Sequence, residues 1–530
     1  MNQPTIITGA VLIGAEERVG RKTFTAVNPA SGVPVGPPIQ EADARDVADA
    51  CRLAAEAFPV FSETTPQTRA VFLESIASGI TALGDELIER AMLETGLPRG
   101  RLEGERARTT GQLDYFARIV RTGAWIDATL DSAQPQRLPQ PRPQLRRRHV
   151  GLGPVVVFGA SNFPLAFSVA GGDTTAALAA GCPVVVKGHP SHPGTGELVA
   201  RALRAAVSRC GLPMGTFSYL PGASHELGRA LVEDPRIQAV GFTGSRRGGL
   251  ALVHAAAGRP TPIPVYAEMS SINPVILFPA AARARGAELG RAYVASLTLG
   301  AGQFCTNPGL VIVLQGADSQ AFMSAAAEAV RACPSQPMLA AHIHESFDQG
   351  VAQVRDQAGV TREAVGPVGP GQNQGRAVLF SVDAAQFMAN PSLAREVFGP
   401  ASLVVKAQDV TQIAALFEHL EGQLTTTVLF DEGDTDLVRQ LLPSLERKAG
   451  RILANGWPTG VEVCDAMVHG GPYPATSDIR TTSVGALAMQ RFLRPVCYQN
   501  FPDSLLPDAL RTDNPLQLAR RVDGVLQCCP

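Results

Sequence analysis

Apolar residues recur at three- and four-residue spacing in the first quarter of the chain, with polar positions between them. In residues 66–97 the apolar positions are Val71, Phe72, Ile76, Ile80, Leu83, Leu87 and Met92. This spacing is typical of amphipathic helices, and it predicts helices over 42–61, 66–97 and 102–123. Gly96 and Pro98 end the second helix, because neither residue readily continues one.

From residue 153 onward the apolar positions form short β-branched runs bounded by Gly and Pro. Residues 153–158 and 182–187 predict strands on either side of an alanine-rich helix over 165–180. The alternation continues with helices over 195–210 and 225–233 and strands over 216–220 and 239–242. Alternating strands and helices predict an α/β fold with a largely parallel sheet that is covered on both faces.

A second α/β unit with its own sheet is expected from Asn273 onward. Its predicted elements are a strand over 274–278, a helix over 280–299, and strands over 310–314, 403–406 and 425–430. The proline-rich residues 132–143 block both helix and central strand, so they predict an extended arm. The tail from Arg491 is rich in Pro, Leu and Arg, as in a packed or swapped terminal extension.

Composition narrows the classes of partner. With 530 residues, 45% of them hydrophobic and 18% charged, the chain can bury a large core in two or three domains. A formal net charge of −2 gives no electrostatic case for binding nucleic acid or anionic lipid. The first residues lack a basic region followed by an apolar core, and no apolar run is long enough for a membrane span. Nine cysteines, with no Cys-x-x-Cys pair and no metal-ligand spacing with histidine, predict a cytoplasmic location and no metal site.

One thiol and one carboxylate are the strongest candidates for chemistry. Cys305 lies in the stretch Gly300-Ala-Gly-Gln-Phe-Cys-Thr-Asn-Pro-Gly309, where small residues let backbone amides approach a substrate. Glu268, 37 positions earlier, follows an apolar run and precedes small residues. Each has an ordinary alternative, since a lone intracellular cysteine is usually a small buried apolar residue and a lone glutamate half of an ion pair. Together they predict a nucleophile and a general base that make and then hydrolyse a thioester.

A glycine-rich turn, Phe242-Thr-Gly-Ser-Arg-Arg-Gly-Gly249, follows a predicted strand and opens a predicted helix. Its backbone amides and the positive end of the helix dipole suit a phosphate. The spacing differs from Gly-x-Gly-x-x-Gly, and such turns are common in α/β proteins. The motif alone therefore leaves phosphate binding and a plain structural turn equally open.

Taken in order, the motifs resemble those of the aldehyde dehydrogenase superfamily over nearly the whole chain. They are Ser161-Asn-Phe-Pro164, Val186-Lys187, Gly241-Phe-Thr-Gly-Ser245, Ala267-Glu-Met-Ser270, Gly302-Gln-Phe-Cys-Thr306, Glu396-Val-Phe-Gly-Pro400 and Asn455-Gly-Trp-Pro458. Two further stretches are most similar to the branch that oxidises α-ketoglutaric semialdehyde (2,5-dioxopentanoate), and close to a bacterial long-chain fatty aldehyde dehydrogenase. They are Lys187-Gly-His-Pro-Ser-His-Pro193 and His469-Gly-Gly-Pro-Tyr-Pro-Ala-Thr-Ser477.

The resemblance implies roles for three catalytic residues. It makes Cys305 the nucleophile on the aldehyde carbonyl and Glu268 the base that activates water. Asn162 becomes the side-chain donor of the oxyanion hole, beside the Cys305 backbone N–H. Without the resemblance, Asn162 would be interpreted as a turn residue.

The resemblance also implies a set of residues around a dinucleotide. Lys187 is expected at the adenosine ribose, and Gly244 with Ser245 at the pyrophosphate. Glu396 is expected at the nicotinamide ribose, with Phe398 packed beside it. Without the resemblance, Lys187 and Glu396 are better interpreted as a strand-end charge and a helix-cap partner.

The cofactor preference follows from one departure from the family pattern. Many NAD-using relatives carry a glutamate three residues after the lysine, where it repels a 2′-phosphate, and this chain has Pro190 there. Two like charges about 4 Å apart near a protein surface repel by roughly 4 kcal/mol, so loss of the acid admits NADP. Lys187 and His189, with His192 or His225, are the cations at hand. We therefore expect NADP, with NAD as an alternative.

The expected architecture is aldehyde dehydrogenase-like. A Rossmann-type cofactor domain covers residues 1–125 and 149–269, a catalytic α/β domain covers 270–478, and an oligomerisation arm covers 126–148 and 479–530. The resemblance implies a homodimer or homotetramer.

The expected reaction is oxidation of α-ketoglutaric semialdehyde to 2-oxoglutarate through a thioacyl enzyme. Arg106 or Arg108 could hold the distal carboxylate, although both suit a surface salt bridge better. Three alternatives stay open: a long-chain aliphatic aldehyde as substrate, acyl transfer to coenzyme A or phosphate with Glu268 idle, and a catalytically silent ligand-binding scaffold.

Overall fold

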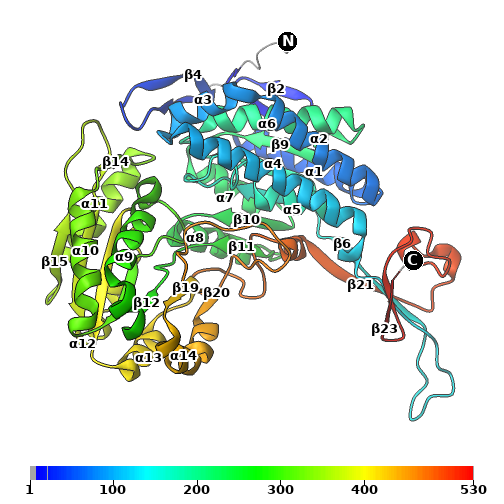
Figure 1. Cartoon of the computed structure of the whole chain (residues 1–530). Coiled ribbons are helices and arrows are strands. Elements are labelled where there is room, and N and C mark those ends of the chain that lie inside the picture. The colour runs from blue at the N-terminus through cyan, green and yellow to red at the C-terminus, as the bar shows by residue number, and fades with distance from the viewer. Residues whose placement is uncertain (1–6, 21, 529–530) are drawn as a thin grey trace.

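The computed structural model describes residues 7–20 and 22–528. The outer ends of the predicted domains, residues 1–6 and 529–530 with Cys529, lie outside this part of the chain. Two α/β lobes stand side by side, and a narrow arm of strands projects from one of them (Figure 1). The α/β class predicted from the alternating pattern is confirmed.

A seven-stranded sheet in the order β11-β10-β7-β8-β9-β1-β2 forms the centre of the first lobe. Its parallel strands are β7 Val155–Phe158, β8 Val184–Lys187, β9 Phe217–Leu220, β10 Ala239–Thr243 and β11 Val265–Glu268. Two strands that the apolar pattern did not predict, β1 Val11–Ile13 and β2 Glu16–Arg18, add an antiparallel edge. The parallel strands are almost entirely buried, as expected for a sheet covered on both faces.

Helices cover both faces of this sheet. They are α1 Ala44–Phe61, α2 Pro66–Ala82, α3 Gly84–Thr95, α4 Arg99–Thr122, α5 Gly172–Ala179, α6 Pro193–Arg209, α7 His225–Glu233 and α8 Arg246–Ala257. The single helix expected over 66–97 is two helices, because Gly84 adopts a left-handed φ of 56° between them. A small hairpin of β3 Thr23–Val27 and β4 Pro34–Gln40 lies outside the sheet.

The helix expected over 165–180 begins only at Gly172. The backbone N–H groups of Leu165 and Ala166 donate to Glu105 Oε1 on α4, at 2.8 and 3.0 Å, instead of to carbonyls of a helical turn. A buried carboxylate from a distant helix thus shapes the turn after β7, which no local pattern could reveal.

The second lobe has its own seven-stranded sheet, in the order β15-β17-β18-β13-β12-β19-β20. Its strands are β12 Val275–Leu277, β13 Leu310–Leu314, β15 Thr361–Val365, β17 Val378–Asp383, β18 Ala401–Ala407, β19 Gln423–Leu429 and β20 Ala449–Ala454. All pair in parallel except β15, the antiparallel edge. The separate sheet predicted from Asn273 is therefore confirmed.

Helices also flank the second sheet. They are α9 Pro279–Thr298, α10 Gln320–Ala332, α11 Ala341–Arg355, α12 Ala384–Ala389, α13 Val410–His419 and α14 Thr435–Lys448. A two-residue pair, β14 Gln336–Pro337 with β16 Gln374–Gly375, lies apart from the sheet. The buried apolar residues of this lobe form clusters distinct from those of the first lobe.

The arm is a five-stranded sheet that leads away from both lobes (Figure 1). In spatial order its strands are β21 Leu493–Gln499, β6 Leu145–Gly151, β5 Thr129–Asp131, β22 Arg520–Val522 and β23 Val525–Gln527. Both segments predicted for the arm contribute strands, while Ala488, Met489 and Phe492 pack in the core of the first lobe. Among the described residues, no helix combines the length and apolar character needed to cross a membrane.

Candidate active site

The two sheets present opposite ends of their strands to one site. Lys187 and Glu268 are the last residues of β8 and β11, and Asn162 follows β7. Cys305 and Glu396 instead precede β13 and β18, which are adjacent parallel strands. In the first sheet, β8 and β9 follow on one side of β7, whereas β10 and β11 lie on its other side. Such a reversal of strand order is a topological switch point, and ligands of α/β sheets bind at the carboxyl ends of the strands beside it.

The loop before Cys305 has an unusual backbone. Gly300, Ala301 and Gly302 all adopt left-handed φ values, 57°, 55° and 66°. A side chain at Gly302 would collide with the backbone of Gly399 and Pro400. The left-handed conformation is strained for Ala301, so surrounding packing must hold it. The glycines that marked this loop in the sequence therefore serve close backbone packing.

The Asn273 side chain holds the Cys305 loop in place through hydrogen bonds to its backbone. Its Nδ2 donates to the backbone oxygens of Cys305 and Asn307, each at 2.9 Å. Its Oδ1 accepts from the hydroxyls of Ser271 and Thr425 at 2.9 and 3.0 Å. The sequence had marked Asn273 only as the start of a new unit, because a bond to a loop 32 residues away leaves no local pattern.

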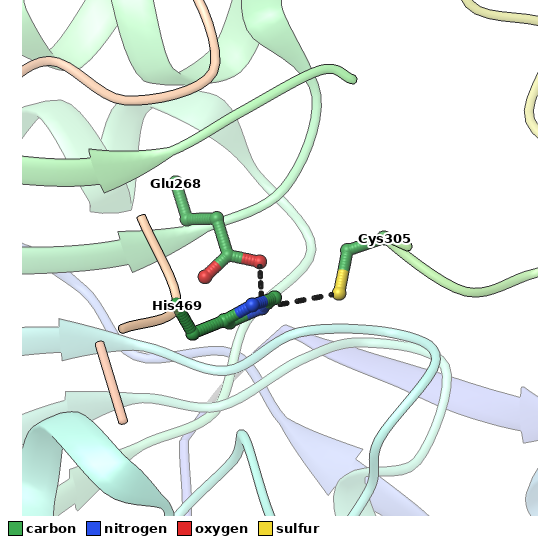
Figure 2. Close-up of side chains that lie close together, drawn as sticks. All are labelled: Glu268, Cys305 and His469. Carbon is green, nitrogen blue, oxygen red and sulfur yellow. Dashed lines mark hydrogen bonds and ion pairs between the residues drawn. The ribbon is translucent and has the colours of Figure 1, made fainter. Parts of the chain in front are cut away.

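Cys305, His469 and Glu268 form a continuous chain of polar contacts (Figure 2). The Cys305 Sγ lies 3.3 Å from His469 Nε2, and the same nitrogen lies 3.0 Å from Glu268 Oε1. His469 is completely buried and Glu268 is 1% exposed. Ser483 Oγ donates to the other carboxylate oxygen, Glu268 Oε2, at 2.7 Å. The structure thus brings the predicted thiol and carboxylate together, with an imidazole between them.

A single ring nitrogen makes both contacts, which constrains the proton on His469. Glu268 accepts from Ser483, and its pKa lies below the ordinary value: burial alone would raise that pKa, but the charge and hydrogen bond of His469 and the bond from Ser483 outweigh burial. An ionised Glu268 can only accept, so Nε2 carries the proton that it donates. Nδ1 has no hydrogen-bond partner among the described residues.

Residues far along the chain hold His469 in place. Its backbone N–H donates to Thr482 Oγ1 at 2.8 Å, and its backbone oxygen accepts from Ser483 Oγ at 3.0 Å. The segment that follows joins β11, where the Met269 N–H donates to Ala475 O at 2.8 Å. The sequence analysis quoted His469 only as part of a family motif and gave it no chemical role. A lone histidine beside two glycines was the only signal.

The environment of Cys305 keeps its thiol protonated at rest. Burial raises the pKa of Cys305 well above its ordinary value, and the negative charge of Glu268 acts in the same direction. The charge of Arg108 acts in the opposite direction. Because the thiolate is the nucleophile, the thiol must pass its proton to a neighbouring base when it attacks. Glu268 is the neighbouring base, since both its charge and its side-chain hydrogen bond act on Cys305.

Asn162 joins the two lobes next to the cysteine loop. Its Nδ2 donates to the backbone oxygen of Gln303 at 3.0 Å, and its own backbone oxygen accepts from Arg101 Nη2 at 2.7 Å. The Arg101 guanidinium lies 4.8 and 4.4 Å from the ring centres of Phe163 and Phe304. A side-chain amide has two N–H groups, so the second remains for an oxyanion beside Cys305.

The predicted adenosine-ribose residues lie at the end of β8. Burial lowers the pKa of Lys187 to about 8. Burial, with the charges of His192 and Lys187, lowers the pKa of His189 well below its ordinary value, so His189 is neutral near pH 7. The rings of His189 and His192 stack at 5.2 Å. Pro190 follows in the same turn, and Lys187 is the one positive charge that this turn offers to a phosphate.

The predicted pyrophosphate turn opens helix α8. Ser245 is its N-cap, and Ser245 Oγ accepts from the Gly248 N–H at 3.2 Å. The Gly244 N–H donates to Glu268 O at 3.1 Å, so that amide is already engaged. A side chain at Gly244 would press against the Phe242 ring. The free N–H groups of the first helical turn, together with the helix dipole, still suit an anion.

Glu396 and Phe398 line a cavity beside the starts of β13 and β18, together with Ser271, Phe304 and Asn307. Burial raises the pKa of Glu396 to about 8, and the charge of Glu268 adds to this rise, while the Ser271 backbone N–H opposes it. The carboxyl group is therefore close to the cysteine cluster and titrates near neutrality. A carboxylate here suits ribose hydroxyl groups, which donate hydrogen bonds. With Lys187 and α8, the residues present fit a dinucleotide.

Glu268, Cys305 and His469 also have the donor set of a zinc site, since their ligand atoms all lie within 4.8 Å of one another. The sequence analysis predicted no metal, because the three residues are far apart in the chain. The Glu268–His469 and His469–Cys305 contacts are already hydrogen-bond distances, which suits proton transfer among them.

Comparisons with known proteins identify the family of the chain. The sequence profile described as the aldehyde dehydrogenase family matches residues 16–472. The alpha-ketoglutaric semialdehyde dehydrogenase 2 of Azospirillum brasilense is 56% identical, covering 98% of this chain and 99% of the relative. The alpha-ketoglutaric semialdehyde dehydrogenase of Acinetobacter baylyi is 48% identical, covering 95% and 96%.

Solved structures share the fold. The crystal structure of 1-pyrroline-5-carboxylate dehydrogenase from Thermus with bound NAD has a TM-score of 0.79 at 21% identity, covering 93% of this chain and 92% of that one. Because the family profile spans most of the sequence and two relatives match almost end to end, the chain belongs to the aldehyde dehydrogenase family, and it is an oxidoreductase that acts on aldehydes.

Proposed function

We propose that this enzyme oxidises α-ketoglutaric semialdehyde to 2-oxoglutarate with NADP, through a thioacyl intermediate on Cys305. The observation that carries the chemistry is the chain of contacts from Cys305 Sγ through His469 Nε2 to Glu268 Oε1, at 3.3 and 3.0 Å. The substrate is supported by the names of the two relatives that match nearly the whole chain.

Glu268 is the base for the thiol in this mechanism. Its charge and its side-chain hydrogen bond both act on Cys305. The thiol proton passes to the Glu268 carboxylate as the sulfur attacks the aldehyde carbon. The His469 Nε2–H donates to Glu268 Oε1 and lies beside the sulfur, so it positions the carboxylate for this transfer.

The oxyanion that forms on the former carbonyl oxygen needs donors beside Cys305. The free N–H of the Asn162 amide and the backbone N–H of Cys305 supply them. A bound nicotinamide would supply the hydride acceptor that oxidises the adduct to a thioester. Glu268 then releases the thiol proton to solvent, and the regenerated carboxylate takes a proton from the water that hydrolyses the thioester.

NADP is the cofactor that the adenosine end favours. Pro190 occupies the place where an acid would repel a 2′-phosphate, and Lys187 supplies a positive charge below its pKa of about 8. The negative charge of Glu41 acts on the pKa of Lys187, but Glu41 is already paired with the Lys22 ammonium at 2.9 Å. His189 and His192 are buried and uncharged, so they add hydrogen bonds and not charge.

The alternatives are less well supported. A purely aliphatic substrate would offer no acceptor to the buried terminal nitrogens of Arg108. Acyl transfer would leave Glu268 idle, although Glu268 is held by two partners in contact with the cluster. A silent scaffold would have no need to preserve a thiol, an imidazole and a carboxylate in mutual contact.

We propose that the chain assembles as a homodimer or homotetramer through its arm. The outer strand β23 has an open edge and exposes Val525 and Leu526 at 65% and 58%. An exposed apolar edge strand favours pairing with another chain. We also propose a cytoplasmic location, because every cysteine within the described residues is a free thiol.

Steady-state reduction of NADP and NAD with α-ketoglutaric semialdehyde, hexanal and decanal tests the proposal. We expect the highest kcat/KM with the semialdehyde and NADP. A higher value with decanal would overturn the substrate assignment, and a higher value with NAD would overturn the cofactor preference.

A further inference from the structure

Three arginines act electrostatically on Cys305, and they differ in how their guanidinium groups are used. Arg101 donates to Asn162 O and lies between two aromatic rings. Arg451 donates to Gly460 O at 2.9 Å and to Pro458 O at 2.6 Å. Both are therefore engaged in holding backbone segments around the site.

Arg108 is different. Its only hydrogen bond within the described chain is a long one, from Nε to Val461 O at 3.4 Å. Both terminal nitrogens, Nη1 and Nη2, are buried without a hydrogen-bond partner among the residues of the structure. Leaving charged donors unsatisfied costs free energy, and such groups are rare unless a ligand or water completes them.

The position of Arg108 points to the substrate. Its guanidinium carbon lies 5.0 Å from the ring centre of Phe167, and the ring of Phe167 lies 6.2 Å from that of His469. Arg108 thus approaches the cysteine cluster across one aromatic ring. The segment that covers it, residues 456–468, has no helix or strand and is partly exposed, so it can yield to a ligand.

The negative groups around Arg108 do not satisfy it. Glu105, one turn earlier on α4, directs Oε1 to the amides of Leu165 and Ala166. Glu268 is held by His469 and Ser483, and Glu462 acts on Arg108 only through space. The two terminal guanidinium nitrogens therefore have no acceptor within the described residues, although Arg108 interacts electrostatically with Cys305 and Glu268.

From this geometry we infer that Arg108 is the specificity residue that binds the distal carboxylate of the substrate, by two parallel N–H···O bonds from Nη1 and Nη2. The inference rests on the proposed function. A planar guanidinium matches a carboxylate in this way, and a carboxylate would satisfy both unpartnered donors at once. The substrate class is then an aldehyde with an anionic carboxylate at its far end.

Arg106 supplies a matched control from the same helix. Its Nη1 donates to Gly84 O at 2.6 Å, at the junction of α2 and α3, away from the cysteine cluster. The sequence analysis could not choose between Arg106 and Arg108. The structure separates them, because only Arg108 has effects on Cys305 and Glu268.

The test compares α-ketoglutaric semialdehyde with pentanal, which has the same number of carbons and no carboxylate. For Arg108→Met, kcat/KM with the semialdehyde should fall roughly 10²-fold, as when one partner of a buried charge pair is removed. Arg108→Lys keeps the charge near Cys305 but loses the planar fork, so kcat/KM should fall by a much larger factor for the semialdehyde than for pentanal. Arg106→Met should match the wild type with both aldehydes.

Inhibition by glutarate gives a second readout that needs no semialdehyde turnover. Glutarate should compete with pentanal in the wild-type enzyme and lose potency roughly 10²-fold in Arg108→Met. Thermal unfolding and the rate of Cys305 alkylation by iodoacetamide check that each variant folds with an intact thiol. Arg108→Lys serves as the deciding variant if Arg108→Met does not fold.

The outcomes separate this inference from the proposed function. A wild-type enzyme without preference for the semialdehyde over pentanal would contradict the proposed substrate, while glutarate inhibition would still decide the role of Arg108. Two results would overturn the role of Arg108 alone. One is a preference for the semialdehyde that is unchanged in both Arg108 variants. The other is a kcat/KM that falls by the same factor for both aldehydes in Arg108→Lys.

Discussion

The cysteine cluster and Arg108 lie on either side of Phe167, and their polar groups differ in whether they have partners. In the cysteine cluster, Glu268 is fully engaged by His469 and Ser483, and His469 connects it to the thiol. At Arg108, the two terminal nitrogens have no partner among the described residues. Groups that exchange protons must already be in contact before substrate arrives. A group that recognises substrate must instead keep its donors free for it.

The difference predicts how variants should behave. Changes in the cysteine cluster should reduce activity toward charged and uncharged aldehydes alike, because they act on the reacting carbon. Changes at Arg108 should act mainly on the aldehyde that carries a carboxylate, and much less on the uncharged one. Measuring both substrates for every variant therefore tests the division between the two regions.

Cys305→Ala should give the largest effect. Loss of the nucleophile removes covalent chemistry, and we expect turnover of both aldehydes to fall by about 10⁴-fold or more. Cofactor reduction in a stopped-flow instrument measures this, and Cys333→Ala, a cysteine of the second lobe with no contact to the cluster, is the control. Residual turnover of one aldehyde only would contradict a shared reaction centre.

Glu268→Gln should stop the reaction after the first half. The enzyme should release about one equivalent of reduced cofactor per site, more slowly than the wild type because an amide cannot take the thiol proton. It should then stall because water is no longer activated, with a loss of roughly 10³-fold in steady rate. Hydroxylamine, which attacks thioesters without a general base, should restore turnover. An unchanged steady rate would show that another group activates water.

His469→Ala should lower kcat/KM for both aldehydes by roughly 10²-fold, because Glu268 loses the donor that positions it, and this is the lower end of the contribution of a general base. Added imidazole should restore part of the activity, and alkylation of Cys305 by iodoacetamide at neutral pH should slow. His254→Ala, an exposed histidine on α8, is the matched control. Full activity without His469 would leave it as a packing residue.

The smallest effect concerns charges outside both regions. Glu396 and Lys187 each titrate at about 8, but Glu396 is ionised above that pH and Lys187 below it. If both ions hold the dinucleotide, cofactor affinity should peak near pH 8 and fall by roughly tenfold per pH unit on either side. Glu396→Gln should remove the acid limb and Lys187→Met the alkaline limb, as measured by fluorescence titration. A flat profile for the wild-type enzyme would contradict both roles.

Much of the fold could be predicted from the sequence. The β-branched runs between Gly and Pro gave the parallel strands β7, β8 and β10, since strands buried on both faces must be apolar throughout. The short edge strands β1 and β2 were missed, because three-residue strands carry too little pattern. The break at Gly84 and the late start of α5 depend on one backbone angle and one distant carboxylate.

The candidate site divides in the same way. The sequence by itself determined which groups are reactive, because a thiol among glycines and a carboxylate after an apolar strand can be recognised from their neighbours. Only the tertiary structure decided that His469 stands between Cys305 and Glu268, and that Arg108 rather than Arg106 approaches them. The first choice depends on contacts between residues 164 and 201 positions apart, and local sequence carries no record of distance in space.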